Sequence, residues 1–287
     1  MSKHATVPFH RRGKAAAAAA LGAVAVLGTG LIYAHAFATT VRPPEGMSDV
    51  RLPQANTTFD YQIGGVYKPA KGVRAVSRDR SVKPAAGLYN ICYVNAFQVQ
   101  PGELGWWRKH HPDLLLRDAG NHPVIDRDWQ EALLDTSTAK KRTRLSEIIG
   151  ARMSGCAKKG FQAVEPDNLD SYERSHGRIK KADNAAFAKL LAERAHTDGL
   201  AIGQKNTVAM LPDRRKIGFD FAVAEECGQY DECDAYAKAY GNRVFVIEYT
   251  NKGFEKACSK WAAELAVVKR DLDVVSRGSA GYVFRTC

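Results

Sequence analysis

The sequence predicts an α/β protein of the (β/α)8 TIM-barrel class, folded as a single domain. Short β-rich runs recur along the chain, and segments of helical length and pattern separate several of them. The runs are continuously apolar rather than alternating, which is typical of parallel strands that are buried on both faces. About 249 residues follow Ala38 in the 287-residue chain, which is a common size for one such barrel.

Residues 1–38 have the pattern of a secretory signal peptide. A basic N-terminal stretch precedes an apolar run at residues 15–34, and small-x-small cleavage sequences end at Ala36 and Ala38. The run is about long enough to cross a bilayer, so an uncleaved anchor that holds the protein at the cell surface is the alternative. We therefore expect residues 39–287 to form a secreted barrel domain.

Eight segments are expected to be the barrel strands. In chain order they are Phe59–Gly65, Val73–Asp79, Gly87–Asn95, Gly160–Pro166, Leu200–Asn206, Phe219–Glu225, Arg243–Tyr249 and Leu272–Gly278. Pro166 cannot donate a hydrogen bond to a neighbouring strand, so the fourth strand is expected to end there. Residues 184–199 and 255–266 show the apolar spacing of helices, and residues 124–145 are expected to be an insertion or a helix.

All six cysteines lie after the predicted signal, and an even number in an exported chain favours disulfides. Cys227 and Cys233 are close enough to close a small loop. Cys258 with Cys287 would tie down the chain end, which leaves Cys92 with Cys156. Zinc ligation is the alternative, but the sequence has no Cys-x-x-Cys or neighbouring His pair to support it.

The charge distribution argues against a nucleic-acid partner. The formal net charge is +11, and it becomes +7 when the four lysine and arginine residues of the predicted signal are subtracted. The remaining basic residues are scattered over segments expected to be helices and loops, where solvated faces explain them. Because no aromatic-rich basic platform accompanies them, we expect no nucleic-acid binding.

Polar and acidic side chains follow the carboxyl ends of most predicted strands. They are Tyr61, Gln62, Tyr93, Asn95, Glu165, Asp167, Asn168, Asp170, Lys205, Asn206, Glu225, Glu226, Glu248 and Tyr249. Polar strand ends are ordinary, but carboxylates after the fourth, sixth and seventh strands would converge on one cleft of a barrel. Two carboxylates on opposite sides of a sugar are the minimum for glycoside hydrolysis, and tyrosines and amides suit sugar hydroxyls. Carboxylate pairs in barrels also serve metals and proton abstraction.

Four segments together resemble a known family. VEPDNLDSY, AHTDGLAIGQKN, FDFAVAEECGQYDEC and VFVIEY, in this order and spacing, resemble glycoside hydrolase family 114, the endo-α-1,4-polygalactosaminidases. The resemblance runs from about Tyr61 to Tyr249 and implies a (β/α)8 barrel, secretion and cleavage of α-1,4-linked galactosamine polymers. It also implies that Asp167 and Glu225 are the two catalytic carboxylates.

These observations combine into one expected activity. We expect a secreted, monomeric, endo-acting and retaining glycosidase that uses no cofactor and no metal, with Asp167 as nucleophile and Glu225 as acid/base catalyst. The other polar strand-end residues are expected to bind the polysaccharide substrate. The protein would contact a membrane only if the N-terminal segment stays uncleaved.

Two alternatives to this activity stay open. Ala224 and Gln204 replace residues usual in the family, which leaves a non-catalytic polysaccharide-binding barrel as the main alternative. A divalent-metal enzyme that uses Glu165, Asp167 and Glu248 is the third possibility.

Overall fold

The computed structural model describes residues 50–287. The predicted signal peptide or anchor at residues 1–38 lies outside the described residues. Within residues 50–287, none of the helices is both long enough and apolar enough to cross a membrane.

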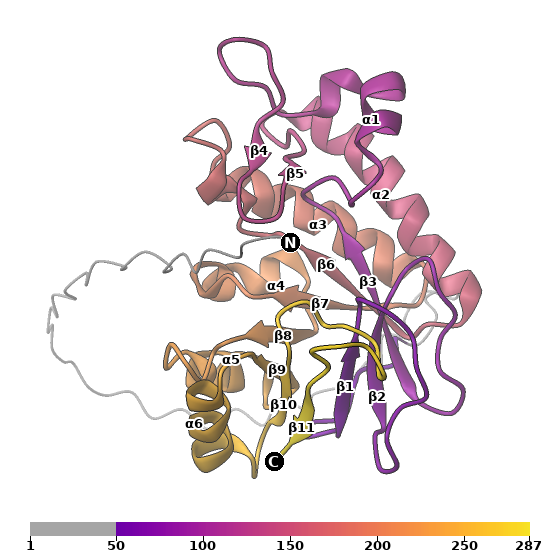
Figure 1. Ribbon diagram of the computed structural model, residues 1–287. Helices are drawn as coiled ribbons and strands as arrows, with labels where there is room; N and C mark the ends of the chain where they lie inside the picture. The colour runs from indigo at the N-terminus through magenta and orange to yellow at the C-terminus, as the bar shows by residue number, and fades with distance from the viewer. Residues whose placement is uncertain (1–49) are drawn as a thin grey trace, which may run out of the picture. The chain divides into compact units, whose positions relative to one another are not determined.

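A mostly parallel sheet of nine strands nearly closes into a barrel (Figure 1). The strand order is β1 (Phe59–Gln62), β2 (Ala75–Asp79), β3 (Tyr89–Asn95), β6 (Ala163–Asp167), β7 (Ala201–Lys205), β8 (Phe221–Glu225), β9 (Val244–Glu248), β10 (Ala266–Arg270) and β11 (Phe284–Thr286). Neighbouring strands are parallel except β10 and β11. Since β1 also lies beside β10, the ends of the parallel sheet meet, and the predicted barrel class is confirmed.

Helices follow the strands from β3 onward. They are α2 (Ala139–Lys159) before β6, α3 (Lys181–Thr197) before β7, α4 (Arg214–Ile217) before β8, α5 (Cys233–Tyr240) before β9 and α6 (Asn251–Trp261) before β10. The connections from β1 to β2 and from β2 to β3 contain no helix in the described structure. Between β3 and α2, the insertion carries α1 (Leu104–His110) and a small hairpin of β4 (Ile125–Asp126) and β5 (Glu131–Ala132).

The eighth strand differs from the prediction. It was expected at residues 272–278, whereas β10 occupies Ala266–Arg270. The predicted helix was too long: α6 ends at Trp261, so the apolar residues that follow it begin a strand. Residues 272–278 instead form a turn, because the Asp271 carboxylate accepts hydrogen bonds from the backbone N–H groups of Val275 (2.8 Å) and Val283 (3.1 Å).

The fourth strand runs one residue beyond its expected end. Pro166 lies inside β6, opposite Val94 of β3, and the strand continues to Asp167. On the other side, β6 pairs with β7 only through Ala163 and Val164. The missing N–H of Pro166 therefore falls beyond that pairing and costs no ladder hydrogen bond.

Alternation along the strands separates two apolar layers. One layer fills the barrel and includes Phe59, Tyr61, Ile91, Ala163, Ala201, Phe221, Val223, Phe245 and Ile247. The intervening residues, such as Val94, Val164 and Ile202, pack with the helices in a second layer. Because side chains alternate along a strand, residues two positions beyond the barrel layer also face inward at the carboxyl end of the barrel.

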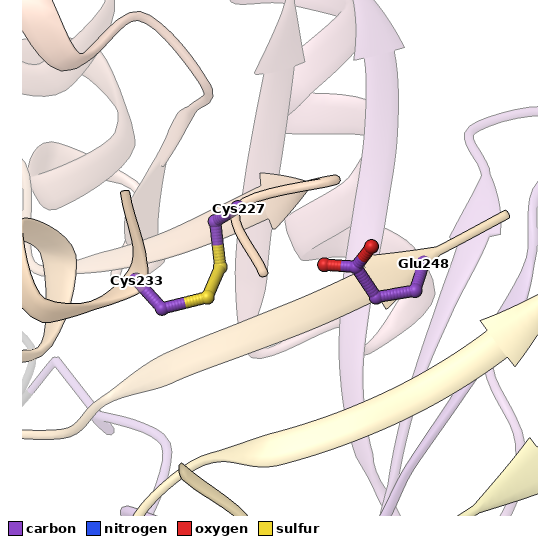
Figure 2. Close-up of side chains that lie close together, drawn as sticks. All are labelled: Cys227, Cys233 and Glu248. Atoms are coloured by element: carbon purple, nitrogen blue, oxygen red, sulfur yellow. A yellow bond between two sulfur atoms is a disulfide. The ribbon is translucent and has the colours of Figure 1, made fainter. Parts of the chain in front are cut away.

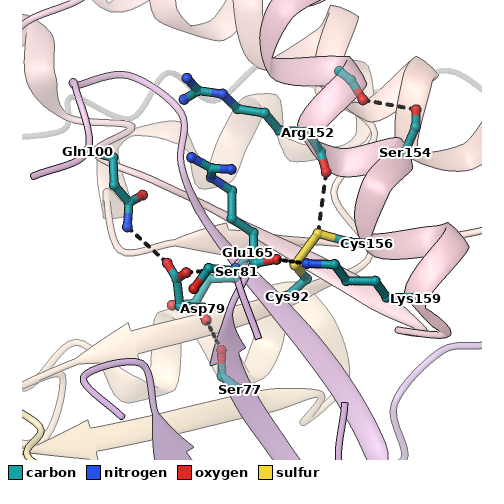
Figure 3. Close-up of a disulfide and its surroundings, with 12 residues drawn as sticks. Ser77, Asp79, Ser81, Cys92, Gln100, Arg152, Ser154, Cys156, Lys159 and Glu165 are labelled. Atoms are coloured by element: carbon teal, nitrogen blue, oxygen red, sulfur yellow. Dashed lines mark hydrogen bonds between the residues drawn. A yellow bond between two sulfur atoms is a disulfide. The ribbon is translucent and has the colours of Figure 1, made fainter. Parts of the chain in front are cut away.

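The six cysteines form three disulfides, which confirms this interpretation of their even number. Cys92–Cys156 links β3 to α2 (Figure 3). Cys227–Cys233 closes the loop after β8, and Cys258–Cys287 ties α6 to the chain end.

Candidate active site

Polar side chains replace apolar ones at the carboxyl end of the barrel interior. Tyr93, Glu165, Lys205, Glu225 and Tyr249 each follow an inward-facing position by two or four residues. The strand period of two therefore directs them to the same mouth, from five different strands or strand ends. The change from apolar to polar residues at this level creates a site above a packed core.

The ammonium group of Lys205 lies at the centre of this layer. Its side chain is 2% exposed, and Nζ lies 3.2 Å from Glu165 Oε1, 3.3 Å from Asp167 Oδ1 and 3.4 Å from Glu225 Oε2. Burial alone would lower the pKa of Lys205, but the surrounding carboxylates outweigh burial and raise it well above its usual value. Lys205 is therefore a permanent positive charge shared by three acids.

Both predicted catalytic carboxylates are held by hydrogen bonds. Asp167 Oδ2 accepts from the Tyr93 hydroxyl (2.9 Å), and Oδ1 accepts from the backbone N–H of Asn168 (2.8 Å). Glu225 Oε2 accepts from the Asn206 amide (2.9 Å), and Oε1 accepts from the Tyr249 hydroxyl. Each carboxylate is thus fixed on two sides but stays partly exposed, at 18% and 23% respectively.

The remaining acid of the layer is completely buried. Glu165 accepts hydrogen bonds from the hydroxyls of Tyr61 (2.8 Å) and Ser77 (2.6 Å), and it is inaccessible to solvent. Burial raises its pKa, and the nearby ammonium of Lys205 opposes the rise. Glu165 is positioned to hold Lys205 and Tyr61 in place rather than to touch a substrate.

The tyrosines around the acids stay protonated. Burial, followed by the charges of nearby carboxylates, raises the pKa of Tyr61, Tyr93 and Tyr249 well above the ordinary value. Their hydroxyls therefore remain hydrogen-bond donors across the working pH range. This gives each carboxylate a donor whose proton does not titrate with it.

Other predicted residues lie around the rim of the mouth. The Asn168 amide donates to Asn95 Oδ1 (3.0 Å), and Asp170 pairs with Arg174 (2.9 Å). On the opposite side, Glu226 accepts from Gln229 (3.1 Å). Burial and the neighbouring Glu225 raise the pKa of Glu226.

Two predicted substrate-binding residues lie outside the cluster. Gln62 is bound to Asp60 and Arg78 on the outer face of β1. Glu248 is completely buried, and its Oε1 accepts from the backbone N–H of Gly228 (2.7 Å). Gln62 and Glu248 each lie one position from an inward-facing residue, Tyr61 and Tyr249 respectively. Because side chains alternate along a strand, those of Gln62 and Glu248 point out of the barrel interior.

The same alternation separates the three residues that the metal alternative would use as ligands. Glu248 points away from Glu165 and Asp167, and the Lys205 ammonium lies between those two acids and Glu225. Glu248 does lie close to Cys227 and Cys233, as Figure 2 shows, but the two sulfurs are joined in a disulfide. A disulfide sulfur is not the thiolate that binds zinc, so this group does not form a zinc site as it stands.

One acid near the mouth was missed by the sequence reasoning. Glu131 of the β4–β5 hairpin accepts a hydrogen bond from the Asn95 amide (2.7 Å). Since Asn95 also contacts Asn168, Glu131 is connected to the segment that carries Asp167. It does not end a barrel strand, so a search of strand ends alone could not find it.

A family model matches most of the sequence. The model of glycoside hydrolase family GH114 matches residues 40–287. The chain belongs to family GH114. The resemblance seen in the four sequence segments is thereby confirmed, and the protein is a glycoside hydrolase.

Solved structures related to this GH114 protein share its fold. The structure of Aspergillus fumigatus Ega3 in complex with galactosamine is 24% identical, with a TM-score of 0.67 over 85% of this chain and all of the other. The glycoside hydrolase domain of PelA from Pseudomonas aeruginosa is 16% identical, with a TM-score of 0.56 over 78% of this chain and 97% of that domain. A search of curated protein sequences found no significant match.

Proposed function

We propose that this GH114 protein is a secreted endo-acting glycosidase that cleaves α-1,4-linked galactosamine-containing polysaccharide with retention of configuration. Asp167 acts as the nucleophile, and Glu225 acts as the acid/base catalyst. The observation that carries the proposal is the pair of partly exposed carboxylates held on either side of one buried ammonium group.

The separation of the two carboxylates supports retention. Asp167 Oδ1 and Glu225 Oε2 lie 3.3 Å and 3.4 Å from the same nitrogen, so they are at most 6.7 Å apart, the sum of these distances. Retaining enzymes hold their carboxyl groups about 5–5.5 Å apart, whereas inverting enzymes need about 6.5–9.5 Å for a water molecule. The bound on these two oxygens is compatible with the shorter spacing of retaining enzymes.

The contacts of each acid support its proposed role. Asp167 accepts hydrogen bonds from the Tyr93 hydroxyl and from a backbone N–H, and it lies beside Lys205. These contacts orient its carboxylate for attack on the anomeric carbon. Glu225 contacts the hydroxyl of Tyr249 and the amide of Asn206, which orient it without burying it. It would protonate the leaving oxygen first and then activate water to hydrolyse the glycosyl-enzyme intermediate.

The balance of charge at the mouth supports a cationic sugar. Lys205 and Arg174 neutralise part of the acidic set, and Glu131 and Glu226 add carboxylates without an ion-pair partner in the described residues. Local attraction of this kind can outweigh the overall positive charge, because exposed charges are screened beyond about 8 Å at physiological salt. The galactosamine bound to Ega3 is a sugar of this class.

The proposed secretion is supported by the cysteines. Three disulfides form in oxidising compartments and are rare in the cytosol. The leader predicted at residues 1–38 provides the export route.

Release of reducing ends from partly de-N-acetylated α-1,4-galactosaminyl polymer tests the proposal. The wild type is expected to release them, and both Asp167→Asn and Glu225→Gln should lose at least about a thousandfold in rate while the polymer still binds. NMR of the first product should show the α-anomer. Binding without release by the wild type would instead establish the non-catalytic polysaccharide-binding barrel.

A further inference from the structure

The β4–β5 hairpin is anchored to the continuation of β3. The backbone N–H of Val99 donates to the carbonyl of Ala132 (2.8 Å), and that of Leu134 donates to the carbonyl of Phe97 (3.0 Å). These bonds fix the strand that begins with Glu131 against the segment just beyond the mouth-forming residue Asn95. The position of Glu131 is therefore set by the sheet and not by a free loop.

Glu131 offers one carboxylate oxygen to a ligand. Its Oε2 accepts from the Asn95 amide (2.7 Å), while its Oε1 has no hydrogen-bond partner within residues 50–287. The residue is only partly buried. On the other side of Asn95, Asn168 donates to Asn95 Oδ1 (3.0 Å) and follows directly after Asp167. A group bound to Glu131 would thus lie beside the proposed nucleophile.

Glu131 also differs from Asp126, Asp167 and Asp170 in forming no ion pair within the described residues. Arg174 pairs with both Asp126 (2.6 Å) and Asp170 (2.9 Å), and Lys205 pairs with Asp167 (3.3 Å). In the part of the chain that the structure describes, no lysine or arginine forms an ion pair with Glu131. An incoming cation would therefore gain a partner there without breaking an existing pair.

An exposed aromatic residue accompanies this carboxyl group. Trp129 lies at the tip of the same hairpin, two residues before Glu131, and is 58% exposed. Single exposed hydrophobic side chains are normal on a protein surface, so the feature that distinguishes Trp129 is its place in the hairpin that carries Glu131. An indole face supplies a platform for the apolar face of a sugar ring, and Glu131, two residues further along the hairpin, supplies a carboxylate that suits an amine.

We propose that Glu131 and Trp129 form a galactosamine-binding subsite next to the catalytic pair, in which the carboxylate binds the sugar's ammonium group and the indole stacks on its ring. This inference rests on the proposed function, and it names the residues that select a de-N-acetylated over an N-acetylated sugar. An N-acetyl group carries no charge, so Glu131 would discriminate between the two forms.

The titration of Glu131 makes the subsite sensitive to pH. Burial raises its pKa to about 7; the Asn95 amide opposes the rise, and Asp167 and Asp126 add to it. The charged and titratable groups facing Glu131 are Asp126 from β4, Asp167 from β6, Tyr93 from β3 and Arg174. Below about pH 7 the free site is increasingly protonated, so its affinity for an ammonium group should fall.

Kinetics on paired substrates test the subsite. Initial rates are measured on fully de-N-acetylated and fully N-acetylated α-1,4-galactosaminyl oligomers of one length, with wild type and Glu131→Gln. Glutamine keeps the acceptor for Asn95 but loses the charge. We expect KM for the cationic oligomer to rise about tenfold with kcat within about twofold, and KM for the neutral oligomer to stay unchanged.

Matched variants separate the two residues from general effects. Trp129→Ala should raise KM for both oligomers, and Trp129→Phe should recover most of the loss because it keeps a ring. Glu255→Gln removes one exposed acid of α6 and should change neither substrate's KM. In the wild type, KM for the cationic oligomer should rise as pH falls from about 8 to about 6, and this slope should be absent in Glu131→Gln.

The outcomes distinguish this inference from the proposed function. If the wild type cleaves the cationic oligomer and Glu131→Gln keeps the same preference between the two substrates, the subsite is refuted and the glycosidase stands. If the wild type cleaves neither, the proposed function fails, and calorimetric titration with the same oligomers still tests the subsite. Equal affinity of wild type and Glu131→Gln for the cationic oligomer in that titration would overturn it.

Discussion

Replacing Lys205 by methionine probes the centre of the site most directly. The substitution keeps most of the volume of the side chain but removes a charge that lies 3.2–3.4 Å from three carboxylates. At an effective dielectric constant of about 20, each such pair attracts by about 5 kcal/mol. Part of this attraction only offsets the cost of burying the charges, so the attraction is an upper limit to the loss.

The expected loss of stability is large enough to measure. Removing one partner from a buried ion-pair network typically costs about 3–5 kcal/mol, because the remaining charges are left without compensation. For a domain of this size, 1 kcal/mol lowers Tm by about 2–4 °C, so Lys205→Met should melt about 6–20 °C lower.

Thermal and urea unfolding at pH 7 check this expectation. Lys252→Met, at an exposed lysine of α6, is the matched control and should leave both measurements unchanged. Adding Glu165→Gln to Lys205→Met removes the completely buried acid that lost its partner, so the double variant should recover at least about 1 kcal/mol. Stability within 1 kcal/mol of wild type for Lys205→Met would refute the central role of the ammonium group.

Two further predictions concern stability. Burial raises the pKa of Glu248 from 4.5 to about 7, so the folded state binds more protons than the unfolded state in this window. Stability should therefore fall by up to about 3 kcal/mol as pH rises from about 4.5 to about 7, and Tm measured against pH should lose this part of its slope in Glu248→Gln. Among the disulfides, replacing both cysteines of Cys92–Cys156, which are 64 residues apart, should cost about 4 kcal/mol in urea unfolding. Replacing Cys227–Cys233, which are 6 residues apart, should cost about 2 kcal/mol, and the reverse order would contradict the loop-entropy reasoning.

Local sequence patterns predicted the barrel because its strands are continuous apolar runs. The same patterns misplaced the last strand, since the apolar face of α6 is followed by the apolar start of β10 and only a short turn at Ala262–Leu265 separates them. No proline or glycine marks that turn, so the helical pattern runs on into the strand. Only the packing of Ala266 and Val268 into the barrel interior decides the boundary.

The alternation of side chains along each strand explains which candidate residues the structure brings together. Strand ends alone placed Glu248 beside Glu225 and Gln62 beside Tyr61, because each pair is found where a strand leaves the barrel. Ile247 faces the barrel interior, and side chains alternate along the strand. Tyr249 therefore also faces inward, and Glu248 faces outward. The sequence contains this information, but it can be used only once the inward register of each strand is known.

The position of Glu131 depends on contacts that no local pattern encodes. It meets Asn95 across 36 residues, because Gln98 pairs with Leu133 and folds the hairpin back over the mouth. Glu131 lacks an ion-pair partner in the described structure because the guanidinium of Arg174 pairs with Asp126 and Asp170 instead. A sequence shows how many acids a loop contains, but which of them remains free to bind a cation follows from where the few basic side chains come to lie. The proposed selectivity of this site for charged sugars would therefore depend on the folded arrangement of its arginine and lysine side chains as much as on its acids.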